Sequence, residues 1–335
     1  MRLSMKTVSL ADATSWIVIG GFALACLLLS HALGFGVLPA RAMLPALGVA
    51  VLAGALALGR RRGDARLVAG ATAFLQMTLF TILGVVLAYL LAARNGPLWD
   101  GWLAAADARL GLDWPAILAA SDRLPAPLLL VGGVAYHSLV LQMVGCIVVL
   151  AGTGRSERLR TTVAAAILAG AVTILLSGLL PAVGNLFDPD RYRTLWPSVA
   201  WRDHPLILGL RTGAVRQVDL SHMTGIVSFP SYHAALPVIL VWGLYPVARL
   251  RAPAAIWAGL TILATPLFGG HYVVDVLAGL LLAIGALAVA ARLAAHVPAP
   301  NGLRSPAIRA TRPARAIGPG CAGRTQGAEV VHDLV

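Results

Sequence analysis

The sequence predicts an all-α membrane protein, a polytopic helical bundle of about eight transmembrane helices. Two observations predict this class. Of the 335 residues, 59% are apolar and only 12% are charged, whereas soluble domains carry about 25% charged residues. The apolar residues also gather in eight runs, most of them long enough to cross a bilayer. Short Arg-rich loops separate several of these runs, which is typical of cytoplasmic loops in membrane proteins.

The predicted spans follow one another along most of the chain. They lie at residues 16–34, 42–58, 68–92, 128–151, 161–180, 234–247, 254–268 and 273–293. The first two form an N-terminal transmembrane hairpin within residues 1–66, and the other six belong to a catalytic membrane domain over residues 67–296. Residues 297–335 are rich in Pro, Ala, Gly and Arg, which predicts a disordered, basic cytoplasmic tail.

Loop charge predicts the orientation of the bundle. If the N-terminus is cytoplasmic, the Arg-rich loops and the tail lie on the same side, and 17 of the 26 basic residues are inside. The sixth and eighth spans then begin on the outer face. We expect a bacterial inner membrane, because arginine almost replaces lysine and alanine is abundant. The net charge of +12 fits contact with anionic membrane lipids, and no nucleic-acid-binding module is present.

Two outer segments lie outside the spans. Residues 97–127 carry three tryptophans and predict an interfacial helix that caps the bundle. Residues 181–227 predict a long polar loop, and long loops are often functional. The three cysteines have no paired spacing, so neither a disulfide framework nor a zinc site is predicted.

The first candidate site motif is Ser228-Phe-Pro-Ser-Tyr-His233, at the start of the sixth span. Ionisable residues at the edge of a membrane span are functional-site hypotheses by default. We expect Pro230 to begin a helix, so that the free N–H groups of its first turn and the Ser231 hydroxyl form an anion site. His233 stands in the same turn, where it can protonate a leaving oxygen.

The second motif is Gly269-Gly-His-Tyr-Val-Val-Asp275, at the start of the eighth span. The i, i+4 spacing predicts that His271 and Asp275 share one helical face. Asp275 can then keep one imidazole nitrogen protonated and leave the other as a nucleophile. Together with His233, this pair supplies an acid, a nucleophile and an orienting base for phosphoryl transfer without a metal.

The two motifs resemble the second and third signature motifs of the type-2 phosphatidic acid phosphatase superfamily. The resemblance covers residues 181–293 and is strongest to the inositol phosphorylceramide synthase-like (inositolphosphotransferase) branch, including its bacterial members. It implies a six-helix phosphatase-type core in which His271 attacks phosphorus to form a phosphohistidine. It also implies that His233 protonates the leaving group, that Asp275 orients His271, and that no metal or organic cofactor is needed.

The chain departs from this family pattern at its phosphate-binding residues. The first family motif, a lysine with Arg-Pro seven residues later, is missing, since Lys6 is the one lysine of the chain. Thr265 occupies the position, six residues before His271, where many phosphatase members carry arginine; the synthase-like branch also lacks that arginine. Arg211 and Arg216, before the first motif, are therefore the candidates for binding the phosphate together with Ser231.

Three functions fit these observations. One is lipid phosphotransfer to an alcohol acceptor, and another is hydrolysis of a lipid phosphate or a polyprenyl diphosphate, with water as acceptor. The third is a non-enzymatic permease or assembly factor, against which the few charges inside the spans argue. The two enzymatic reactions share their first half, so the motifs do not separate them. The expected partners are a lipid phosphate, water or an alcohol, and the surrounding membrane lipids.

Overall fold

The computed structural model describes residues 10–295, most of which are helical. The residues expected to form a cytoplasmic tail lie outside the described part of the chain. The long helices are α1 (Leu10–Leu33), α2 (Pro39–Arg62), α3 (Ala65–Ala92), α8 (Ser156–Leu179) and α12 (Val273–Ala295). The shorter ones are α4 (Asp100–Arg109), α5 (Trp114–Ser121), α6 (Ala126–His137), α7 (Leu139–Gly152), α9 (Val199–Thr212), α10 (Tyr232–Leu244) and α11 (Arg251–Ala264).

The helices confirm an integral membrane protein of the all-α class. Within residues 10–295, six helical segments are long and apolar enough to cross a membrane, or seven if the bent pair of α5 and α6 counts as one span. The count is thus lower than the expected eight, although each predicted apolar run coincides with helix. The fourth run is interrupted at Ser138, which separates α6 from α7, and the sixth is the 13-residue helix α10.

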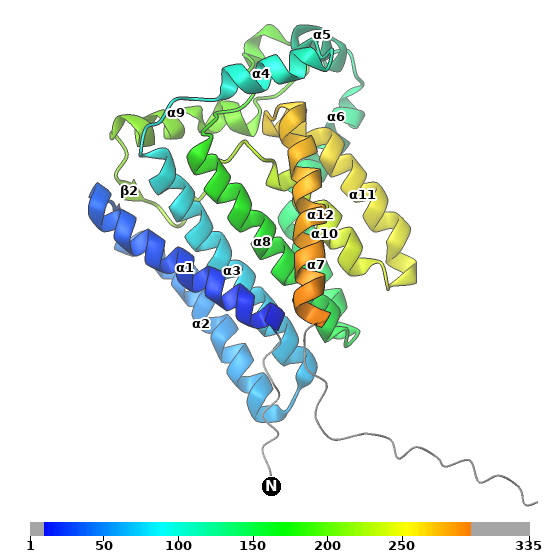
Figure 1. The fold of residues 1–335 in the computed structure, drawn as a ribbon. Coiled ribbons are helices and arrows are strands. Elements are labelled where there is room, and N and C mark those ends of the chain that lie inside the picture. The colour runs from blue at the N-terminus through cyan, green and yellow to red at the C-terminus, as the bar shows by residue number, and fades with distance from the viewer. Residues whose placement is uncertain (1–9, 296–335) are drawn as a thin grey trace, which may run out of the picture. The chain divides into compact units, whose positions relative to one another are not determined.

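Helices α3 and α8 form the centre of the bundle (Figure 1). The helices α1 and α2 both pack against α3, and α10 packs against α7, α8, α11 and α12. Small residues of α8, including Ala164, Ala165 and Ala169, are fully buried, and small side chains allow helices to approach closely in membranes. Large apolar side chains point outward instead: Leu141 is 71% exposed and Leu263 is 79% exposed. Such a surface suits lipid rather than water.

One end of the bundle carries α4, α5 and α9 (Figure 1). Residues 97–127 form the two short helices α4 and α5 instead of the single expected helix, because the chain turns at Gly111, whose φ is +79°. A left-handed backbone conformation of this kind favours glycine.

Residues 181–227 are more structured than the long loop that we predicted. They contain the 3₁₀ turn η1 (Pro189–Arg191), the helix α9 and the strand β2 (Gln217–Val218). Ser198 caps α9 by accepting a hydrogen bond from the Trp201 N–H, and Gly213 ends the helix in the left-handed conformation. Strand β2 pairs in parallel with β1 (Gly36–Val37), which ties this segment to the connection between α1 and α2.

Candidate active site

The two sequence motifs meet where α10 and α12 begin. The Ser231 N–H donates a hydrogen bond of 3.0 Å to the main-chain oxygen of Asp275. The two helices approach closely at this point, since a Cβ atom on Gly279 would lie 2.2 Å from the Ser231 carbonyl oxygen. A glycine is therefore required on α12 for the first motif to reach the second. His233, His271 and Asp275 are brought together by this contact.

The Asp275 carboxylate is fully buried beside His271. Its Oδ2 atom lies 3.3 Å from Nδ1 of His271 and accepts hydrogen bonds from the Ser228 hydroxyl at 2.9 Å and the Tyr272 N–H at 3.0 Å. The helix α12 begins at Val273, so His271 lies in the preceding turn and not on the helical face that we predicted. An acidic side chain in a first helical turn commonly reaches back to the N–H before the helix, as Asp275 does. These contacts fix the carboxylate against Nδ1.

The other nitrogen of His271 faces the first motif. Nε2 lies 3.5 Å from the Ser231 hydroxyl, which makes no hydrogen bond to the first turn of α10. The His233 and His271 rings have centroids 6.4 Å apart, and the Tyr136 ring stacks on His233 at 4.4 Å. Helix α10 begins at Tyr232, so Pro230 lies just before its N-cap instead of opening the helix as expected. The two imidazoles are close enough to act on one phosphoryl group.

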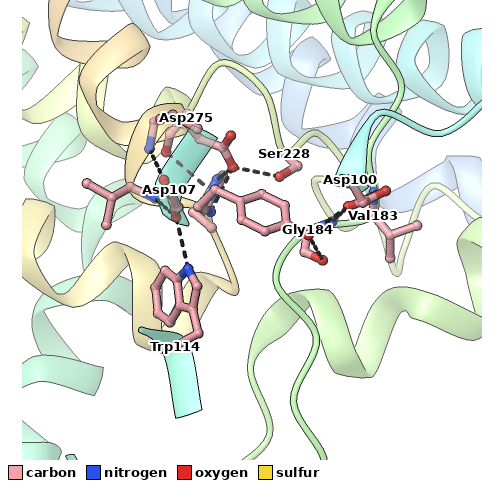
Figure 2. A network of polar contacts seen from close by, with 12 residues as sticks. Asp100, Asp107, Trp114, Val183, Gly184, Ser228 and Asp275 are labelled. Atoms are coloured by element: carbon pink, nitrogen blue, oxygen red, sulfur yellow. Dashed lines mark hydrogen bonds and ion pairs between the residues drawn. The ribbon is translucent and has the colours of Figure 1, made fainter. Parts of the chain in front are cut away.

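Two aspartates of α4 brace the turn that carries His271 (Figure 2). Asp107 is fully buried and accepts hydrogen bonds from the N–H groups of Val273 and Val274, at 2.9 and 3.0 Å, and from the Trp114 indole at 2.9 Å. It therefore caps α12 from another helix, and a carboxylate is favourable at that end of the helix dipole. Asp100 accepts from the N–H of Gly184, at 2.8 Å, and thereby holds the neighbouring chain segment.

That neighbouring segment touches the glycine pair before His271. Gly270 has φ of +75°, and its carbonyl accepts a hydrogen bond of 2.6 Å from the Asn185 N–H. A Cβ atom on Gly184, where φ is +112°, would lie only 2.5 Å from the Gly270 oxygen. Both glycines are therefore required by backbone conformation and by close approach.

A cavity of about 30 Å³ opens between these elements. Its polar lining includes His233, His271, Ser228, Tyr136 and Asp203. The volume is enough for a water molecule or a hydroxyl group. No arginine or lysine is among the described residues that line it. Hydroxyl, N–H and imidazole groups are therefore the donors available inside the cavity.

The structure does not bring the two predicted phosphate-binding arginines to this cavity. Arg211 donates a hydrogen bond to the Gly96 carbonyl and lines a separate small pocket. Arg216 lies over the Phe35 ring and contacts the Leu210 carbonyl. Gly96 and Phe35 are distant in sequence from these arginines, so both contacts help to hold the outer segment in place. Thr265 is also fully buried and donates to the Thr261 carbonyl, so it does not replace the missing arginine as an anion ligand.

Several functional candidates were not predicted from the sequence. Ser228 was part of a quoted motif, but its bond to Asp275 depends on contact between α10 and α12. Asp203 stood in a segment expected to be a loop. Burial raises the pKa of its carboxyl group, and the Thr224 side chain and the Arg202 charge oppose this shift. The capping signals at Ser198 and Gly213 could have revealed α9 and placed Asp203 on a helix.

The structure is a helical membrane bundle in which a buried His–Asp pair shares a small cavity with a second histidine. The family model described as PAP2 superfamily matches residues 101–289, more than half of the chain. The chain belongs to this superfamily, which confirms the resemblance at that level and supports a phosphatase-type function. Searches of curated proteins and of solved structures return no match.

Proposed function

We propose that the protein is a membrane-embedded phosphatase or phosphotransferase that acts on a lipid phosphate or a lipid head-group phosphodiester through a phosphohistidine intermediate. The observation that carries this proposal is the contact of 3.3 Å between His271 Nδ1 and Asp275 Oδ2, with His233 in the same cavity. Because the carboxylate keeps the proton on Nδ1, Nε2 presents its lone pair to phosphorus.

The reaction has two displacements at phosphorus. His271 Nε2 attacks, the bond from phosphorus to the leaving oxygen breaks, and His233 gives that oxygen a proton. A hydroxyl group then attacks the phosphohistidine, the N–P bond breaks, and the proton of the hydroxyl returns to His233. Ser231 supports the phosphoryl oxygens, since its hydroxyl lies 3.5 Å from Nε2. No step uses a metal ion.

A lipid substrate fits the position of the site. The cavity lies where α10 and α12 begin, and the apolar outer surface of the bundle continues along α12 through the exposed Leu277 and Leu281. A lipid can thus place its phosphate in the cavity and its chains beside the helices. We place the protein in the inositolphosphotransferase-like branch and in a bacterial inner membrane, with the cavity on the periplasmic or outer face.

Transfer and hydrolysis differ in the acceptor of the second displacement. The purified protein in detergent, with EDTA present, is given a labelled phosphatidic acid, a phosphatidylinositol or a polyprenyl diphosphate, each with and without an added alcohol. New phosphoester indicates a transferase, and free phosphate indicates a hydrolase. His271→Ala must abolish both products. Loss of activity in EDTA, restored by a divalent ion, would contradict the metal-free mechanism, and absence of any His271-dependent product would favour a non-enzymatic role.

A further inference from the structure

One acidic residue in the cavity has no role in the mechanism described above. Helix α9 presents Ala200, Asp203 and Ile207 to the cavity, and their spacing places them on one helical face. Asp203 is the one carboxylate among the described residues that line the cavity. Tyr136, whose ring stacks on His233 at 4.4 Å, lines the same cavity. Asp203 therefore shares this cavity with the acid, His233.

The Oδ2 atom of Asp203 is buried and has no hydrogen-bond partner within the described residues. A buried carboxylate oxygen without a donor is costly, and such atoms are rare in folded proteins. Among the described residues, the one other buried carboxylate oxygen without a hydrogen-bond partner is Oδ1 of Asp275. That carboxylate is already held through Oδ2 by His271, Ser228 and Tyr272. Asp203 is the carboxylate that remains available for a ligand.

The ligand of Asp203 must be a hydrogen-bond donor. A phosphoryl oxygen in direct contact with Oδ2 would be repelled by the carboxylate, so the phosphoryl group lies at His271 and the part of the cavity beside Asp203 is left to another ligand. A volume of about 30 Å³ accommodates a hydroxyl group or a water molecule. The group that must reach the cavity in the second displacement is a hydroxyl nucleophile, either water or an alcohol.

We propose that Asp203 binds this acceptor and selects acceptors that carry a second O–H group. The attacking hydroxyl forms the new O–P bond, the N–P bond to His271 breaks, and the proton of the hydroxyl passes to His233. Because the proton of the attacking hydroxyl goes to His233, Asp203 needs another donor. Its Oδ2 atom accepts a hydrogen bond from the second hydrogen of water or from a neighbouring hydroxyl of a polyol. This inference rests on the proposed phosphohistidine mechanism.

The proposal predicts a preference for diols over monohydric alcohols. A hydrogen bond to a charged group contributes about 1.5–3 kcal/mol, which corresponds to about tenfold or more. Ethylene glycol and ethanol have similar sizes but differ by the second hydroxyl. Because both are small and neutral, the ratio of their transfer products isolates the contribution of Asp203.

The experiment uses the full-length protein in detergent with p-nitrophenyl phosphate as donor. The pre-steady-state burst of nitrophenol reports the first displacement, whose leaving group needs no proton. The glycol and ethanol phosphoesters are quantified at equal acceptor concentrations. The wild type should favour the glycol by about tenfold or more, and Asp203→Ala should reduce that ratio to about the twofold expected from the number of hydroxyls, with the rate of the nitrophenol burst changed by less than about threefold. Asp203→Asn, which retains one acceptor oxygen, should give an intermediate ratio.

Asp190→Ala is the matched control. Asp190 is an exposed acid of the same outer segment, so this variant should keep the wild-type ratio.

An unchanged ratio in Asp203→Ala would overturn the proposal, as would a preference for an amino alcohol over the glycol that depends on Asp203. An equal fall in the rate of the nitrophenol burst and in both products would overturn the proposal in favour of a structural role. If the wild type transfers only to water, Asp203→Ala should slow hydrolysis of the phosphoenzyme about tenfold and preserve the nitrophenol burst; an unchanged hydrolysis rate would overturn it. Absence of His271-dependent nitrophenol release would instead reject the proposed function itself.

Discussion

The Ser228 hydroxyl donates a hydrogen bond of 2.9 Å to the Asp275 carboxylate, across 47 residues of sequence. This bond joins the two motifs of the site, because Ser228 opens the first and Asp275 closes the second. It also adds a donor to the carboxylate that contacts His271. The relative position of the two histidines thus depends on contacts between α10 and α12 as well as on each motif.

The first prediction concerns Asp275→Asn. The Ser228, Tyr272 and His271 contacts of the carboxylate all fall on Oδ2. An amide oxygen in that position keeps the Ser228 and Tyr272 donors but has no charge to stabilise the imidazolium formed on phosphoryl transfer, and an N–H₂ group in that position places the imidazole proton on Nε2. In either orientation the rate should fall about a thousandfold or more. The melting temperature in detergent should change little. Asp190→Asn, on the exposed turn η1, should retain full activity; a fully active Asp275→Asn protein would contradict the assigned orientation of His271.

His233→Ala should separate substrates by the basicity of their leaving groups. General-acid catalysis contributes about 10²–10⁴-fold when the leaving oxygen must be protonated. A natural lipid phosphate has such a leaving group, whereas p-nitrophenyl phosphate does not. We therefore expect a large loss of activity on the lipid and a much smaller loss of nitrophenol burst. Equal losses on both donors would remove the support for His233 as the acid.

Gly279→Ala should weaken the contact between α10 and α12. The added Cβ atom would lie 2.2 Å from the Ser231 carbonyl oxygen, which belongs to the backbone and must move. Overpacking of this kind costs about 1–3 kcal/mol, and we expect a lower melting temperature together with reduced activity.

Gly285→Ala is the matched control on the same helix. No atom lies within 4 Å of the Cβ atom that it would add, and alanine is favoured over glycine inside helices by about 1 kcal/mol. This variant should be as stable as the wild type or more stable. If both variants behaved alike, close approach at Gly279 would not be what positions Ser231.

A fourth prediction concerns the side of the membrane that the cavity faces. Ser221 and His222 are exposed residues of the segment before the first motif. A cysteine at either position should react with a membrane-impermeant thiol reagent on cells with a permeabilised outer membrane, after the native cysteines are replaced. A cysteine at Ser305, which lies outside the described residues, should not react. The reverse pattern would place the chemistry in the cytoplasm.

The sequence predicted the helical runs and the central residues of the site because both have local signals. An apolar run of the right length marks a span wherever it packs, and His271 and Asp275 are only four residues apart. The local structure of residues 181–227 was not predicted in this way, because their polar composition did not indicate α9 or the pairing of β2 with β1. The positions of Arg211 and Arg216 could not be predicted from the sequence either, because Gly96 and Phe35, which they contact, are distant in sequence.

The hydrogen bonds accepted by the two aspartates of α4 were also not predictable from local sequence. Asp100 and Asp107 lie within residues 97–127, which the sequence predicts to be an interfacial helix. Asp107 instead caps a helix that begins 166 residues later. No local pattern predicts a cap that is donated by another helix, because the pairing depends on the packed bundle.

The central claim, that His271 carries the phosphoryl group, is tested most directly by trapping the intermediate. The purified protein is mixed with a ³²P-labelled donor, quenched within the first turnover and digested, and the labelled peptide is mapped. We expect an acid-labile, base-stable phosphate on His271 that is absent from the His271→Ala variant. The same label on His233 would reverse the two roles, and a phosphate on neither histidine would contradict covalent catalysis at this site.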